Sequence, residues 1–93
     1  MNIPKSLLSH AMVHYLLAVH KLKEEKGYAR ITDVAKNLQL TKGSVSTAIK
    51  NGIEKELLEY EDDTKFINLT SKGHGIVHHI LSSRTLLFYL STQ

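Results

Sequence analysis

The 93-residue chain contains no cysteine, no tryptophan and only one proline. Without cysteine it has no disulfide framework, no thiolate metal site and no cysteine nucleophile. No apolar run approaches the roughly 20 residues of a membrane-spanning helix. The N-terminal residues also lack the uninterrupted apolar segment and the cleavage site of a signal peptide. We therefore expect a cytoplasmic chain that forms a single domain and has no membrane partner.

Signs of catalysis are missing as well. No Ser/His/Asp arrangement is indicated by spacing, no glycine-rich loop suits a phosphate, and the carboxylates concentrate between Glu54 and Asp63. Lys and Arg number 12 against 9 Asp and Glu, so the formal net charge is +3. That charge is compatible with a polyanionic partner but does not identify one. We expect a protein that is not an enzyme.

The segment from Ile31 to Ile53 is typical of two short helices joined by a tight turn. In its second half, apolar residues recur at the spacing of a helix that packs on a core: Val45, Ala48, Ile49, Gly52 and Ile53. Thr41 and Ser44 offer capping side chains for that helix. Its other face carries Gly43, Ser46, Thr47 and Lys50. This pattern favours a helix-turn-helix that enters the DNA major groove, although a polar helix face is often merely solvated.

Two β-prone runs, 57–60 and 66–69, follow this segment and predict a hairpin with an acidic loop. The predicted fold is mainly α with a small β-hairpin, a winged helix-turn-helix with long first and last helices. Its parts are a first helix (1–26), a helix-turn-helix (31–55), a wing hairpin (57–69) and a last helix (71–92). Residues 28–31 suit only a β-bridge, which we expect against the wing. Because the wing's carboxylates repel phosphate, only Lys65 and backbone amides are expected to contact DNA from there.

The end of the last predicted helix is apolar on all sides. A surface helix of a small monomer does not normally have this pattern. The run predicts self-association through the first and last helices, as a homodimer. The candidate dimerisation residues are Leu86, Leu87, Phe88 and Leu90.

Three motifs, EEKGYARITDVAKNL (24–38), SVS (44–46) and LTSKG (69–73), carry a family resemblance. They resemble the N-terminal domain of the diphtheria-toxin-repressor family, and most of all its manganese-transport-regulator branch. The resemblance implies a dimeric, metal-activated winged-helix transcription regulator. It also implies base-edge and phosphate contacts from the second helix. With the basic residues nearby, the candidate DNA-binding residues are Thr32, Lys36, Thr41, Lys42, Gly43, Ser44, Ser46, Thr47, Lys50 and Lys65.

The same resemblance shows where the chain departs from the family. His14 and Leu17 stand where the manganese branch has acidic metal ligands, and Arg84 stands where the family has a histidine. The family's metal site is therefore not expected in its usual form. Gly52 replaces a large apolar residue, and we expect it to leave a packing gap.

Six histidines provide a second candidate metal site. His10/His14 and His74/His78 are i, i+4 pairs, a spacing that lets two imidazoles on one helix face bind a transition metal ion. Since the first and last helices are neighbours in this fold, the four side chains could converge. The alternatives are exposed histidines without a function, which are common on helices, or a cluster that responds to pH.

Two functions therefore compete. The first is a sequence-specific DNA-binding transcription regulator that lacks the family's usual metal ligands, with double-stranded DNA as its partner. The second is a winged-helix module that binds another protein through Leu86–Leu90 and does not read DNA.

Overall fold

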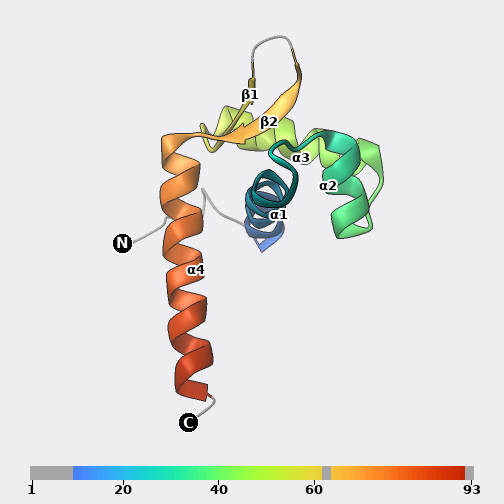
Figure 1. Ribbon diagram of the computed structural model, residues 1–93. Coiled ribbons are helices and arrows are strands. Elements are labelled where there is room, and N and C mark those ends of the chain that lie inside the picture. Colours follow the sequence, from blue (N-terminus) through green and yellow to red (C-terminus); the bar gives the residue numbers. More distant parts are fainter. Residues whose placement is uncertain (1–9, 62–63, 92–93) are drawn as a thin grey trace.

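The computed structural model describes residues 10–61 and 64–91, and it describes side chains as far as Ser82. The element order is α1 (His10–Lys26), α2 (Ile31–Leu38), α3 (Lys42–Glu54), β1 (Leu58–Glu61), β2 (Phe66–Leu69) and α4 (Ser71–Ser91). Helices α1, α2 and α3 gather beneath the hairpin, and α4 extends away from them as a long arm (Figure 1). The predicted winged helix-turn-helix fold is confirmed.

The observed element bounds lie close to the predicted ones. Helix α1 ends at Lys26, and Gly27 follows with a positive φ of 85°, a backbone conformation that favours glycine. Strand β1 begins at Leu58, one residue later than predicted, and pairs with β2 in an antiparallel register from Leu58–Leu69 to Glu61–Phe66. The predicted start of the first helix near Asn2 lies outside the described residues.

The core is built from the apolar stripe of each element. The residues that helix α1 buries are Met12, Tyr15, Leu16, Ala18, Val19 and Leu22. On α3, Val45 and Ile49 are fully buried, while Ala48 and Ile53 are half-buried. These two helices pack around Leu57, Ile67 and Ile76 from the hairpin and α4. Burial of the α3 stripe leaves its opposite face to solvent.

The predicted packing gap at Gly52 is wrong. A Cβ atom built on Gly52 would lie 2.6 Å from Leu58 Cδ1 and 3.4 Å from Met12 Sδ. Leu58 is 1 % exposed, so its side chain fills the space that a larger residue would need. Glycine at this position lets β1 approach α3 closely. The lower helix propensity of glycine is the cost of that approach.

The hairpin and α4 meet at Thr70. Its hydroxyl donates a hydrogen bond to the Glu56 carbonyl (2.6 Å) and accepts one from the Gly73 amide (3.0 Å), which makes Thr70 the cap of α4. The Thr70 amide donates to the Leu57 carbonyl (3.1 Å). These bonds hold the start of α4 against the start of β1.

Candidate nucleic-acid interface

Helix α3 presents a polar face that its own cap helps to shape. The Thr41 hydroxyl accepts a hydrogen bond from the Ser44 amide (3.2 Å) and donates one to Ser44 Oγ (2.9 Å). Lys42, Gly43, Ser44, Thr47 and Lys50 are exposed, whereas Ser46 is only half-exposed at the margin of the face. The structure therefore places five of the predicted α3 residues, together with Thr41, on one accessible surface.

Thr47 lies in the middle of this face, and its hydroxyl already donates a hydrogen bond within α3. Thr47 Oγ1 donates to the Gly43 carbonyl one turn earlier (3.1 Å). Its oxygen can still accept a hydrogen bond, and its methyl group is free to make apolar contacts. Thr47 is thus suited to accept from a base amino group or to contact a thymine methyl group.

Asn51 is a residue that the sequence reasoning missed. It is exposed and follows Thr47 by four residues, so the two side chains lie on the same face of α3. Extending the helical spacing from Gly43 through Thr47 by one more turn would have found it. An asparagine amide can bind adenine with two hydrogen bonds, which makes Asn51 a further candidate for base contact.

The predicted phosphate-binding lysines are all exposed. Lys36 lies on α2, Lys42 and Lys50 on α3, and Lys65 just before β2. None of the four forms an ion pair with another side chain within residues 10–61 and 64–82. Thr32, in the first turn of α2, is half-buried. The lysines are thus available to an external anion.

A buried carboxylate holds the start of α2. Asp33 is 7 % exposed and accepts hydrogen bonds from the Arg30 amide (3.2 Å) and Arg30 Nε (3.3 Å), while Lys26 Nζ lies 3.7 Å from its other oxygen. Burial acts to raise the pKa of Asp33, but the Arg30 hydrogen bonds and the Lys26 charge outweigh it. The pKa therefore lies below its ordinary value of 3.8.

We expect Asp33→Asn to lower the free energy of unfolding at neutral pH by about 1–2 kcal/mol, because it weakens the bonds from Arg30 and Lys26. Because the carboxyl pKa is lowered by folding, the charged carboxylate stabilises the fold at pH values above its ordinary pKa of 3.8. This stabilisation is lost as the pH falls through the pKa of the folded state. The difference in the free energy of unfolding between wild type and variant should therefore shrink at pH values below 3.8. Urea denaturation across the acidic range measures it, and a constant difference would contradict the assignment.

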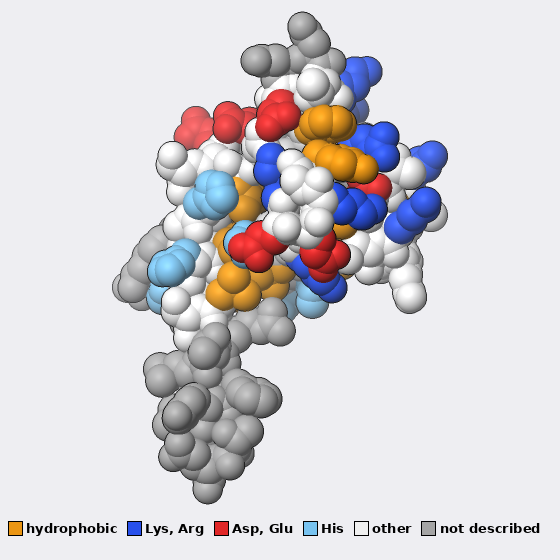
Figure 2. Space-filling model, viewed as in Figure 1, with side chains coloured by type: hydrophobic (Ala, Val, Ile, Leu, Met, Phe, Trp, Pro, Cys, Tyr) orange, Lys and Arg blue, Asp and Glu red, His pale blue; other side chains and the backbone are white. Residues whose placement is uncertain are grey.

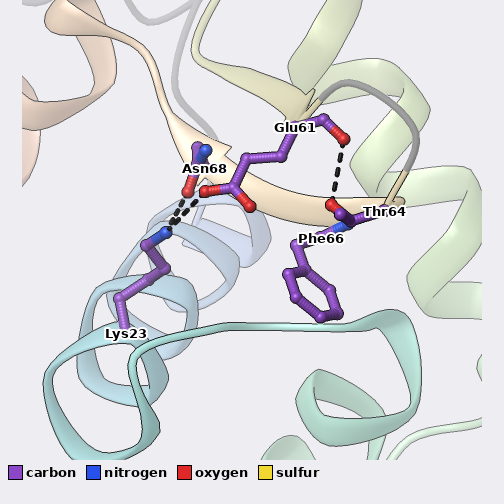
Figure 3. A network of polar contacts seen from close by, with 5 residues as sticks. All are labelled: Lys23, Glu61, Thr64, Phe66 and Asn68. Carbon is purple, nitrogen blue, oxygen red and sulfur yellow. Dashed lines mark hydrogen bonds and ion pairs between the residues drawn. The ribbon is translucent and has the colours of Figure 1, made fainter.

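The wing is tied to α1 by the network in Figure 3. Lys23 Nζ donates to Asn68 Oδ1 and lies 3.5 Å from Glu61 Oε1. A hydrogen bond from Asn68 and the positive charge of Lys23 lower the pKa of Glu61. Across the hairpin end, the Thr64 hydroxyl donates to the Glu61 carbonyl (3.0 Å) and accepts from the Phe66 amide (3.2 Å). One wing carboxylate is thus paired, whereas Glu59 stays exposed, and Asp62 and Asp63 lie outside the described residues.

The four predicted metal-binding histidines do not converge. His14 lines a hollow between α1 and the connection from α2 to α3, beside Leu38 and Leu40. His74 and His78 line a different groove, where the α1 residues are His20 and Glu24. Within the described residues, no group of three or more His, Asp or Glu side chains could hold a metal ion. The four histidines therefore do not form one site within the described residues, because α4 lies against the turn of α1 that carries His20 and Glu24. Metal binding by either i, i+4 pair alone stays a prediction.

The candidate dimerisation residues Leu86, Leu87, Phe88 and Leu90 belong to α4 by their backbone, but their side chains lie outside the described part. Among the helices that the structure describes, none is long and apolar enough to cross a membrane.

Comparison with known proteins identifies the family of this chain. Residues 7–65 match the family model of the iron-dependent repressor N-terminal DNA-binding domain. The chain is 34% identical over 77 residues to the HTH-type transcriptional regulator MntR of Shouchella clausii, covering 83% of this chain and 53% of the regulator. MntR of Bacillus subtilis is 35% identical over 77 residues, and the match covers 83% of this chain and 54% of that regulator. The chain belongs to the iron-dependent repressor family.

Solved structures agree on the fold. A MarR family protein from Bacillus stearothermophilus superposes with a TM-score of 0.77 at 14% identity, covering 92% of this chain and 60% of that one. S. aureus MepR bound to ethidium bromide superposes with a TM-score of 0.75 at 24% identity, and the match covers 92% of this chain and 65% of MepR. The chain is therefore a winged helix, and the family to which it belongs is defined by an N-terminal DNA-binding domain. The chain spans about half the length of the curated relatives it matches.

By the family resemblance, the metal-ligand positions of this domain hold residues that do not suit the family's metal ion. His14 is exposed, and Leu17, which the resemblance places at the second ligand position, is a half-buried apolar residue packed against the core. The Arg84 side chain lies outside the described residues, but a guanidinium carries a fixed positive charge and has no lone pair for a metal. Manganese and iron(II) favour carboxylate and imidazole ligands, which Leu17 and Arg84 cannot supply.

Proposed function

We propose that this domain binds duplex DNA with a sequence preference, with α3 in the major groove, as the DNA-reading part of a transcription regulator. The observation that carries the proposal is the division of α3 into two faces. Val45 and Ile49 are fully buried, while the opposite face is exposed, polar and basic. The family membership supports the same partner.

Each part of the exposed face has a distinct role in this proposal. Lys36, Lys42 and Lys50 neutralise phosphates on either side of the groove and fix the position of α3 without reading sequence. Thr47 and Asn51 contact base edges, with Ser46 at the margin. Gly43 has open space around its missing side chain, so packing does not require glycine there. The absence of a side chain instead lets DNA approach the first turn of α3 closely.

Metal control through this domain's own residues is not part of the proposal, because the ligand positions hold Leu17 and Arg84. We also propose that the regulator acts as a homodimer. A two-fold axis would present two α3 helices to half-sites about one DNA turn apart. The arm formed by α4 (Figure 1), with the apolar run at its end, is the element that we assign to that contact. The mass of the chain in solution tests it.

Thr47→Ala tests the docking orientation. After selection of a preferred duplex from a random pool, we expect the variant to lose discrimination at one base pair by roughly 1–3 kcal/mol. Thr47→Ser keeps the oxygen and Thr47→Val keeps a methyl group, so the pair shows which group makes the contact. Anisotropy titrations of preferred and single-mismatch duplexes measure the loss.

Ser82→Ala is the matched control, since it removes an exposed hydroxyl from α4 and should leave discrimination unchanged. If wild type and all three Thr47 variants rank the duplexes alike, α3 does not lie in the groove as proposed.

A further inference from the structure

A stack of three side chains joins the α1–α2 connection to the base of the wing. The Arg30 guanidinium lies 5.2 Å from the centre of the Tyr28 ring, and Tyr28 is itself stacked on Phe66 with 5.2 Å between ring centres and 25° between planes. The Ile67 amide donates to the Ala29 carbonyl (2.7 Å), so residues 28–30 contact the wing as predicted, but they form no β-bridge. The start of α2 and the base of the wing therefore form one unit.

The stack and Asp33 hold Arg30 in one orientation. Its Nε is directed to the buried Asp33 carboxylate, and the Tyr28 ring covers a face of the guanidinium. The Arg30 side chain is nevertheless 52% exposed, whereas that of Asp33 is 8% exposed. No bond within the described residues uses the terminal Nη groups. The Asp33 carboxylate is thus turned inward, while the two Nη groups of the Arg30 guanidinium remain available to a ligand.

The surface around this stack is basic. The Lys26 side chain, 47% exposed, shares Asp33 with Arg30, and the exposed Lys65 precedes Phe66. Figure 2 shows Lys and Arg side chains gathered on the side of α2 and the base of the wing, around a small apolar patch. The sequence of the wing tip, by contrast, carries Glu61, Asp62 and Asp63. Charge therefore favours contact between DNA and the base of the wing over contact with its tip.

We propose that Arg30, held by Tyr28 and Asp33, binds a backbone phosphate beside the groove that α3 occupies. The first helix of a helix-turn-helix crosses the DNA backbone, and Arg30 immediately precedes that helix. A guanidinium with two free donors matches the oxygens of a phosphate, and a preordered side chain loses less entropy when it binds. This inference rests on the proposed DNA binding and adds to it a contact outside the two helices of the motif.

The test is the salt dependence of DNA affinity for Arg30→Gln, which removes the charge but keeps a planar end group. We expect the slope of log affinity against log salt to become shallower by about 0.9, with the same effect on preferred and random duplexes. Arg30→Lys should restore most of the slope. Lys21→Gln, which removes an exposed lysine paired with Glu25 on α1, is the charge-matched control and should leave the slope unchanged.

Because Arg30 also supports Asp33, each variant is first melted, and binding is measured well below its melting temperature. A wild type that does not bind DNA would overturn the proposed function and this inference together. A wild type that binds, with Arg30→Gln showing the wild-type slope, would overturn the inference alone. Loss of the same slope in Lys21→Gln would also overturn it, since net charge would then explain the effect.

Discussion

Replacing Gly73 by alanine is expected to lower the free energy of unfolding by about 3 kcal/mol. A Cβ atom at this position would overlap the Leu57 carbonyl oxygen and would lie 3.3 Å from Leu69 Cδ2. Leu57 is fully buried, and its carbonyl also accepts the hydrogen bond from the Thr70 amide, so its backbone cannot move without breaking the joint between α4 and the hairpin. Urea denaturation followed by circular dichroism measures the change.

Gly75→Ala is the matched control, two residues further along α4. Nothing lies within 4 Å of a Cβ atom there, and the residue is helical. Alanine should therefore raise the free energy of unfolding, by up to about 1 kcal/mol, through helix propensity alone. Similar losses in both variants would show that α4 does not pack on Leu57 as described.

Replacing Lys36, Lys42 and Lys50 together by alanine is expected to weaken DNA binding on the order of 100-fold at moderate salt, since each lost charge-assisted contact contributes about 1 kcal/mol or more. The slope of log affinity against log salt should become shallower by about 2.7, because each phosphate contact contributes about 0.9. All duplexes should be affected alike, since phosphate contacts carry no sequence information. Anisotropy titrations at several salt concentrations measure both quantities.

A variant with Lys21 and Lys72 changed to alanine is the control. Both residues are exposed, and they lie on α1 and α4, outside the helix-turn-helix. If this variant loses as much slope per lysine as the triple variant, the charge of the chain as a whole attracts DNA, and α2 and α3 have no special role.

The sequence predicted the buried face of α3 because helical spacing alone decides which residues share a face. Val45 and Ile49 therefore had to be buried together, and Thr47 had to face solvent. The wing was equally accessible to prediction, since alternation and turn residues are local signals. The same local rule, carried one turn further, would have identified Asn51.

The errors arose where a result depends on which distant elements meet. The supposed gap at Gly52 is filled by Leu58, and no local pattern reveals how closely β1 approaches α3. The turn of α1 that faces His74 follows from the crossing of two helices, so His20 could not be preferred to His14 in advance. The stack of Arg30, Tyr28 and Phe66 likewise depends on Phe66, which is far in the sequence from the other two residues.

The most direct test of DNA binding by this domain is the affinity of the wild-type chain for random and selected duplexes as salt is varied, with a chelator and with added manganese. We expect tight binding at low salt that weakens with a slope of about −2.7 or steeper, because at least three lysines release counterions. A selected duplex should bind more tightly than a random one, and manganese should change neither value. Absence of binding at low salt, or an affinity independent of salt, would contradict the account.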